Sequence, residues 1–295
     1  MRGQSSQKRK PEWLRIRFRR SEDYFEIART LRTFGLHTVC EEAHCPNSTE
    51  CWGRRTATFM ILGDICTRSC RFCAVEKAKA GRPVDTTEPS RLAEAVRQLG
   101  IRYAVVTSVD RDDLPDGGAE HFANCVRAIK DLSPGSGVEV LIPDFHGDLK
   151  FLRKVVESQP DVIGHNIETV KRLQSQLRDP RASYKTSLEV LEKVKKLKPR
   201  IYTKSSLMVG LGESQAEVLE ALNDLRARGV DIVTIGQYLR PSVRHVPVVE
   251  YIKPEVFELY RFEAQRLGFK HAFSGPLVRS SYHAAELFSQ QGTDH

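Results

Sequence analysis

The chain has 295 residues and a formal net charge of +8, with 40% hydrophobic and 28% charged residues. This balance is ordinary for a globular protein, and the length suffices to bury a substantial core. No apolar run approaches the roughly 18 residues that a transmembrane helix needs, so the sequence predicts no membrane span.

The positive charge is concentrated at the N-terminus. Residues 1–20 contain eight Lys and Arg residues and one acidic residue, which leaves the rest of the chain nearly neutral. A protein that coats nucleic acid usually spreads its basic residues over a face of the fold, so we expect no nucleic-acid partner. We expect residues 1–20 to form a basic, partly disordered arm. It is either simply solvated or helps to dock an acidic protein partner.

Short apolar runs alternate with helical patterns from Ala57 onward, mostly without the polar alternation of a half-exposed sheet. Gly100, Gly229 and Gly268 each follow a predicted helix, where glycine readily takes the left-handed cap conformation. We expect strands at Ala57–Gly63, Arg102–Ser108, Gly137–Ile142, Asp161–His165, Ile201–Val209, Asp231–Ile235 and Phe269–Phe273, and helices at Ser90–Leu99, Ala119–Leu132, Leu149–Glu157, Ser187–Leu197, Ser214–Arg228 and Glu255–Leu267.

This alternation predicts an α/β fold built on a parallel sheet. Six or seven β/α units fall short of the eight of a closed barrel, so we expect a partial (β/α)6 barrel similar to a TIM barrel. A doubly wound open sheet is the alternative. We expect an N-terminal extension over residues 21–56, the barrel over residues 57–275 and a C-terminal extension over residues 276–295.

The seven cysteines are unevenly distributed. Six lie in two groups within 34 residues, and only Cys125 is isolated, in an apolar run that predicts a buried core thiol. An odd number of cysteines in a chain of this length argues against a disulfide framework. The two groups therefore indicate metal or cluster binding.

The second group has the spacing Cys66-x3-Cys70-x2-Cys73, directly after the first predicted strand. Three thiolates on one short loop can hold three irons of a 4Fe–4S cluster, which is normally ligated by thiolates. With no fourth cysteine nearby, the remaining iron can chelate the amino and carboxylate groups of a small molecule. Such an open position favours catalysis over simple electron transfer. A zinc site is the alternative, but structural zinc usually takes four ligands in paired spacings.

The first group has the spacing Cys40-x4-Cys45-x5-Cys51 and predicts a second cluster. It also lacks one local ligand. Either a residue from elsewhere in the chain completes it, or that iron stays open.

Together these motifs resemble the radical S-adenosylmethionine superfamily and, within it, the lipoyl synthase family. Phe72 before the last cysteine belongs to the superfamily pattern. Further blocks extend the resemblance over most of the chain. They are Gly63–Cys66, Thr107–Leu114, Asp116–Ala119, His165–Thr169, Gly210–Glu213, Thr234–Leu239 and Arg279–Tyr282.

The resemblance implies a reaction and its cofactors, which are two 4Fe–4S clusters and S-adenosylmethionine. One electron from the cluster at Cys66, Cys70 and Cys73 cleaves S-adenosylmethionine to methionine and a 5′-deoxyadenosyl radical. Two S-adenosylmethionine molecules are cleaved in turn, and one radical attacks carbon 6 of an octanoyl chain and the other carbon 8. The auxiliary cluster donates the two sulfur atoms and is consumed. A serine of the C-terminal segment ligates that cluster in the family, which implies Ser281, or else Ser280, beside Cys40, Cys45 and Cys51.

Contacts to S-adenosylmethionine are expected at the carboxyl ends of the strands, where parallel β/α folds bind ligands. The side chains expected there are Thr107, Ser108, Asn166, Glu168 and Lys204, with Glu168 suited to the ribose hydroxyls, and the loop backbone at Phe72 is expected to contact the adenine. For each side chain, a helix cap or a solvated loop residue is the alternative interpretation.

The resemblance also implies partners. They are an octanoylated lipoyl-carrier domain (of a 2-oxoacid dehydrogenase or the glycine-cleavage H protein), a low-potential electron donor (ferredoxin or flavodoxin) and an iron–sulfur carrier that rebuilds the auxiliary cluster. We expect a cytoplasmic location. A sulfur-inserting enzyme acting on another substrate is one alternative. A non-catalytic iron–sulfur or zinc protein that binds nucleic acid through its basic tail is the other.

Overall fold

The computed structural model describes residues 9–15, 22–42, 47–53 and 56–281. Most of the predicted basic arm, all of the chain after Ser281, and Cys45 lie outside the described residues. No helix in the described part of the chain is long and apolar enough to cross a lipid bilayer.

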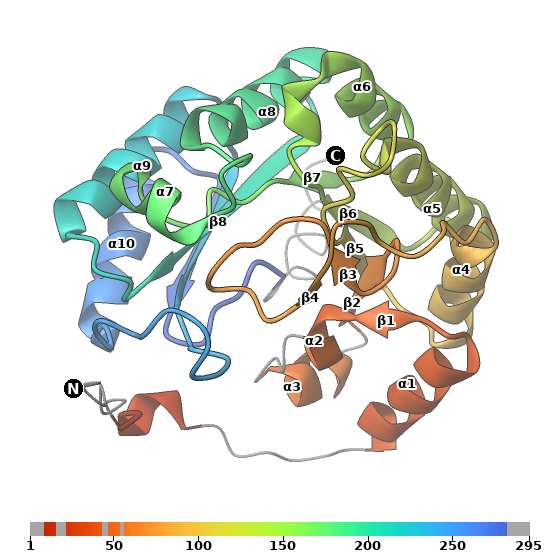
Figure 1. Ribbon diagram of the computed structural model, residues 1–295, viewed down its shortest axis with the longest axis horizontal. Coiled ribbons are helices and arrows are strands. Elements are labelled where there is room, and N and C mark those ends of the chain that lie inside the picture. The colour runs from red at the N-terminus through yellow and green to blue at the C-terminus, as the bar shows by residue number, and fades with distance from the viewer. Residues whose placement is uncertain (1–8, 16–21, 43–46, 54–55, 282–295) are drawn as a thin grey trace.

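One eight-stranded sheet forms the centre of the molecule (Figure 1). Its strand order is β1-β2-β5-β6-β7-β8-β9-β10, and every neighbouring pair is parallel except β1 with β2. Among the described residues β10 pairs only with β9, so the sheet is an open, partial barrel. The strands are β1 (His37–Thr38), β2 (Thr56–Ile61), β5 (Tyr103–Ser108), β6 (Gly137–Leu141), β7 (Val162–Gly164), β8 (Tyr202–Val209), β9 (Ile232–Gln237) and β10 (His271–Gly275).

Helices cover the outer face of the sheet, as Figure 1 shows. The long helices are α4 (Glu88–Gln98), α5 (Ala119–Leu132), α6 (Leu149–Glu157), α8 (Tyr184–Leu197), α9 (Gln215–Ala227) and α10 (Pro254–Arg266). Shorter elements are α7 (Gln174–Leu177), the two-stranded pair β3 (Ile65–Cys66) and β4 (Glu76–Lys77), and the 3-10 turns η1 (Glu12–Leu14), η2 (Phe145–Gly147) and η3 (Lys171–Leu173).

The seven predicted strands and six predicted helices are confirmed, with ends shifted by a few residues. The three predicted cap glycines have positive φ angles of 58° at Gly100, 78° at Gly229 and 87° at Gly268. Helix α9 begins with a capping box, in which Ser214 and Glu217 each bond the other's backbone N–H. Cys125 is fully buried in the core, as predicted.

The N-terminal extension folds against the edge of β2. Its elements are α1 (Glu22–Thr33), β1, α2 (Val39–Glu42) and α3 (Ser48–Gly53). Strand β1 pairs with β2 in antiparallel register, His37 opposite Met60 and Thr38 opposite Phe59. Trp52 of α3 is fully buried and stacks on Tyr24 of α1 at a ring distance of 4.7 Å. Trp52 also belongs to the same buried core cluster as Phe59 of β2 and Leu92 of α4, which joins the segment that carries the first cysteine group to the barrel.

Candidate functional site

The loop after β2 carries Cys66, Cys70 and Cys73 and crosses in front of the sheet (orange in Figure 1). Main-chain bonds tie it to the loops that follow other strands. The Thr67 N–H donates to the carbonyl of Asp110 over 2.9 Å, and the Arg71 N–H donates to the carbonyl of Leu177 over 2.8 Å. The three cysteines therefore lie at the carboxyl edge of the sheet, where the sequence predicted them.

All three thiols accept a main-chain hydrogen bond. The N–H of Arg68 reaches Cys66 Sγ and the N–H of Asp179 reaches Cys70 Sγ, both at 3.4 Å, while Val75 donates to Cys73. Donors of this kind stabilise negative charge on sulfur.

Burial acts in the opposite direction on these thiols. It raises the pKa of Cys66 to about 12 and that of Cys70 to about 11, and it also raises the pKa of Cys73. Nearby carboxylates add to the shift, Asp110 for Cys66 and Glu168 for Cys70. Three thiolates are therefore stable here only when a strong positive charge such as cluster iron binds them. The donor set fits a 4Fe–4S cluster.

Arg68, between the first two cysteines, is the anchor of this loop. Its side chain is only 3% exposed. The guanidinium makes two bonds of 2.7 Å to the fully buried Asp144 and two of 2.9 Å to Asp112, and it lies 3.4 Å from Asp110. Burial raises the pKa of Asp144, but the hydrogen bonds from Arg68 outweigh it and hold that pKa at about 2. The pair is thus ionised at neutral pH.

Asp144 is presented by a strained turn after β6. Phe145 and His146 both have positive φ angles, 45° and 53°, which non-glycine residues rarely adopt. The Asp144 carboxylate accepts the N–H of His146 within the same turn. Strain of this kind persists only where surrounding contacts fix it, and here the bidentate pair with Arg68 is one such contact.

A second ion pair holds the middle of the loop. Asp179 accepts the N–H and the hydroxyl of Ser69 at 2.8 and 2.9 Å, and Arg181 donates to Asp179 and to the carbonyl of Thr67. The side-chain hydrogen bond from Arg181 holds the pKa of Asp179 well below its usual range. Arg68, Asp144, Asp179 and Arg181 were not predicted from the sequence. Their only signal is the presence of charged residues at strand ends and beside the cysteines.

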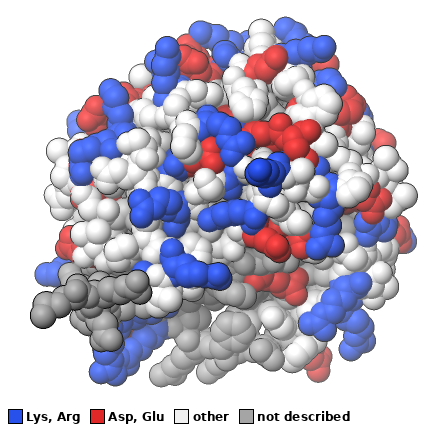
Figure 2. Space-filling view, in the orientation of Figure 1, with Lys and Arg blue, Asp and Glu red and all other residues white. Residues whose placement is uncertain are grey.

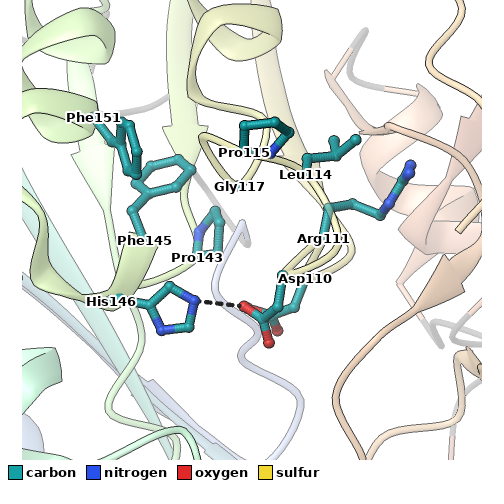
Figure 3. A pocket seen from close by; sticks show the side chains of 10 residues that line it. Asp110, Arg111, Leu114, Pro115, Gly117, Pro143, Phe145, His146 and Phe151 are labelled. Carbon is teal, nitrogen blue, oxygen red and sulfur yellow. Dashed lines mark ion pairs between the residues drawn. The ribbon is translucent and has the colours of Figure 1, made fainter. Parts of the chain in front are cut away.

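A small cavity of about 40 Å³ lies beside Asp110, between the loops that follow β5 and β6 (Figure 3). Apolar side chains including Leu114, Phe145 and Phe151 form most of its wall. His146 lies at its rim with Nε2 3.2 Å from Asp112 Oδ1, an ion pair when the imidazole is protonated. The cavity therefore adjoins the Arg68 anchor.

Four predicted cofactor contacts lie at strand ends on this edge. Asn166 donates a 3.1 Å hydrogen bond to Glu168, and burial raises the pKa of the Glu168 carboxyl. The hydroxyl of Ser108 is buried without a hydrogen-bond partner among the described residues. Thr107 donates instead to the carbonyl of Leu141 at 2.9 Å. Ser108, Asn166 and Glu168 thus have free capacity for a ligand, whereas the Thr107 hydroxyl proton is already used.

Lys204 does not lie where the sequence predicted it. It is the third residue of β8, five residues before the strand ends, and it is 2% exposed. Its ammonium makes bonds of 2.8 and 3.0 Å to Glu139, which also accepts from Tyr103. A buried lysine needs such a partner. The prediction of Lys204 at a strand end was wrong, because Lys204 lies early in β8 and is the buried counter-charge of Glu139.

Phe72 is half-buried and packs against the core cluster formed by β8, β9 and helices α8 to α10. His165 is buried, with Nδ1 2.9 Å from the carbonyl of Ile142 and Nε2 3.0 Å from the hydroxyl of Ser187. Burial lowers the pKa of His165 to about 4, so this histidine is neutral and structural.

The first cysteine group lies in the N-terminal extension. Cys40 is in α2 and Cys51 in α3, both half-buried, and Cys45 falls outside the described residues. Asn47, which is 5% exposed, donates a 2.7 Å hydrogen bond from its side chain to the carbonyl of Leu277. This bond ties the cysteine segment to the start of the C-terminal extension, which carries the half-buried Ser280 and Ser281.

Gly236, at the end of β9, makes room for the same C-terminal segment. A Cβ atom at this position would lie 2.1 Å from the carbonyl oxygen of Val278, well inside contact distance. Only glycine therefore allows Val278 to pass so close to the strand. Asn47 thus bonds this segment, and Gly236 leaves room for it beside β9.

Comparison with known proteins identifies the family. The radical SAM superfamily matches residues 60–235, and the N-terminal domain of lipoyl synthase of the Radical_SAM family matches residues 1–45. A lipoyl synthase of Anaeromyxobacter sp. (strain Fw109-5) is 57% identical over 280 residues, 95% of each chain. The chain belongs to the lipoyl synthase family. A lipoyl synthase of Symbiobacterium thermophilum is 58% identical and covers 96% of this chain and 88% of its own.

Solved structures share the fold of this lipoyl synthase family member. The FeFe-hydrogenase maturase HydG from Carboxydothermus hydrogenoformans has a TM-score of 0.56 and 14% identity, covering 92% of this chain and 78% of its own. A methylornithine synthase has a TM-score of 0.54 and 16% identity, covering 72% of this chain and 63% of its own. The fold is thus the partial barrel of the radical SAM superfamily. As a family member, the chain is a radical S-adenosylmethionine sulfur-inserting enzyme that uses S-adenosylmethionine and two 4Fe–4S clusters.

Proposed function

We propose that this chain inserts sulfur at carbons 6 and 8 of an octanoyl group carried on a lysine of a lipoyl-carrier domain. The observation that carries the proposal is the Asn47–Leu277 bond, which joins the first cysteine group to the serine-bearing C-terminal extension. It supports an auxiliary cluster ligated by Cys40, Cys45, Cys51 and Ser281, separate from one ligated by Cys66, Cys70 and Cys73. Ser280 is the alternative serine ligand.

When bound, these clusters supply the electron that cleaves S-adenosylmethionine and the sulfur that enters the product. The chain's own residues bind S-adenosylmethionine and orient it. Asn166 donates a hydrogen bond to the Glu168 carboxylate, which we expect to accept hydrogen bonds from ribose hydroxyls. The buried hydroxyl of Ser108 is free to bond the amino acid or ribose moiety. The Phe72 backbone is proposed to contact the adenine. Holding the cofactor in one orientation would restrict each attack to one carbon of the octanoyl chain at a time.

The remaining partners are proposed on chemical grounds. The reaction needs low-potential electrons, which ferredoxin or flavodoxin supplies, and a consumed auxiliary cluster needs an iron–sulfur carrier to rebuild it. Cysteine thiolates that ligate clusters must stay reduced, which favours a reducing compartment such as the cytoplasm.

Anaerobic turnover on a defined carrier tests the function. The chain with both clusters reconstituted is mixed with S-adenosylmethionine, dithionite and an octanoylated carrier domain. We expect 5′-deoxyadenosine and a carrier whose mass shows two added sulfur atoms. Formation of 5′-deoxyadenosine with an unchanged carrier would instead indicate a sulfur-inserting enzyme with another substrate.

The C-terminal segment offers a second test. In Gly236→Ala the new methyl group displaces Val278, and in Asn47→Ala the Leu277 carbonyl loses its partner. Both changes are expected to lower thiolation at least about tenfold. Losing about 1.4 kcal/mol of the free energy that holds the segment in place lowers its properly placed fraction by a factor of ten. Cleavage of S-adenosylmethionine should persist.

Gly135→Ala is the matched control, because a Cβ atom at Gly135 meets nothing within 4 Å. The readout apart from activity is the iron and sulfide content of the auxiliary cluster, which should fall in the two variants and not in the control. Full auxiliary occupancy with normal thiolation in Gly236→Ala would contradict the serine ligand.

A further inference from the structure

The loop that carries Cys70 and Cys73 has an exposed basic surface. From Cys70 to Arg82 the sequence has four basic residues and one acidic residue. Arg71, Lys77 and Lys79 are exposed on this loop, and Arg244 is exposed on the loop after β9. We call these four residues the basic rim. Figure 2 shows Lys and Arg side chains at the middle of this face, with Asp and Glu side chains beside them.

The basic rim lies directly over the backbone of the proposed cluster ligands. Lys77 Nζ donates a 2.9 Å hydrogen bond to the carbonyl of Cys70. The loop after β9 bonds the same segment twice, from the N–H of Val246 to the Arg71 carbonyl at 3.3 Å and between His245 Nε2 and the Cys73 carbonyl at 3.1 Å. A molecule in contact with the rim is therefore separated from these ligands by little more than one layer of side chains.

An exposed apolar side chain adjoins one residue of the rim. Val243, one residue before Arg244, is 79% exposed. An apolar residue surrounded by charged ones is the usual arrangement of a transient protein interface, in which charge speeds the encounter and the apolar contact completes it. Exposed basic residues on this side favour an acidic partner.

We propose that the basic rim docks an acidic one-electron carrier protein, which reduces the cluster at Cys66, Cys70 and Cys73. The proposal rests on the proposed function, since only a redox cluster here needs such a partner. One electron leaves the carrier's reduced cofactor, which is oxidised by one electron, and enters the cluster, and no bond is made or broken. The octanoylated domain, in contrast, must deliver a fatty chain to a radical, which requires an opening and not a charged surface over cluster ligands.

The test uses the reconstituted chain and a reduced acidic flavodoxin as the probe. Lys79→Glu/Arg244→Glu reverses two rim charges that touch no proposed ligand. Lys150→Glu/Lys185→Glu is the matched control, with the same charge change on exposed residues of α6 and α8. The rate of cluster reduction is followed by loss of visible absorbance, without carrier domain or turnover.

At low ionic strength the rim variant is expected to be reduced about tenfold more slowly than the wild type or the control. The difference should shrink in about 0.5 M salt, where surface charges are screened. Reduction by dithionite and iron content should be equal in all three proteins, which shows that the fold and the cluster are intact.

Equal flavodoxin rates in the rim and control variants would overturn the proposal. An unchanged flavodoxin rate with weaker binding of the octanoylated domain would also overturn it and assign the rim to that domain. Because cluster reduction is measured without the octanoylated substrate, the result can be interpreted even if the proposed sulfur insertion fails. A wild-type chain that holds no reducible cluster at Cys66–Cys73 would instead refute the proposed function itself.

Discussion

Replacing Cys70 by alanine is expected to abolish cleavage of S-adenosylmethionine, whereas replacing Cys40 should leave cleavage intact and abolish thiolation. The first change removes a proposed ligand of the catalytic cluster, so no electron reaches the bound cofactor. The second removes a proposed ligand of the auxiliary cluster, which supplies sulfur only. Measuring 5′-deoxyadenosine and carrier mass in the same reaction separates the two effects.

Cys125→Ala is the control, because Cys125 is a core thiol of α5 and belongs to neither group. It should keep both activities. Loss of cleavage in Cys40→Ala, with the Cys66–Cys73 cluster still present by spectroscopy, would refute the separation of roles between the two groups.

Replacing Arg68 by alanine should cost about 3–5 kcal/mol of unfolding free energy, because it leaves the buried carboxylate of Asp144 without its counter-charge. The loop would also lose its attachment to the ends of β5 and β6, so we expect little or no cluster at Cys66, Cys70 and Cys73. Chemical denaturation of the chain without clusters measures the stability, and iron analysis after reconstitution measures the cluster.

Arg71→Ala is the matched control on the same loop, since Arg71 is exposed and, among the described residues, its guanidinium bonds the Gln176 carbonyl. It should change stability little. A stability loss of the same size in both variants would contradict the role of the buried pair.

The same pair gives a pH dependence with a defined sign. Asp144 has its pKa lowered to about 2 in the folded chain, against about 3.9 in an unfolded one. Its contribution to stability is therefore complete above about pH 4 and is lost as the pH falls toward 2. Arg68→Ala should lack this part of the acid destabilisation.

The sequence predicted the barrel well because each element carries its own signal. Helices α5 and α6 have the predicted bounds, since the apolar periodicity and the end residues that define a helix lie within its own short segment of sequence. The N-terminal helices α1–α3 were missed. Their segment shows no repeated pattern, and its fold depends on packing such as Trp52 stacked on Tyr24 and buried in the same core cluster as Phe59 of the barrel.

The anchors of the site could not be predicted in the same way. Arg68 and Asp144 are 76 residues apart in sequence, and Asn47 and Leu277 are 230 apart. The spacing in sequence gives no sign of either contact, because it is the topology of the sheet that brings the two residues together. Lys204 shows the reverse error, in which a charged residue expected at the sheet edge serves as a buried counter-charge to Glu139 inside the barrel.

The central claim is that the chain leaves one iron of the Cys66–Cys73 cluster free to bind S-adenosylmethionine. Electron–nuclear double resonance on the reduced cluster, with nitrogen- and oxygen-labelled S-adenosylmethionine, tests it most directly. We predict coupling to the amino nitrogen and the carboxylate oxygen of the labelled cofactor. A cluster coordinated by a fourth protein side chain, with no coupling to either label, would contradict the claim.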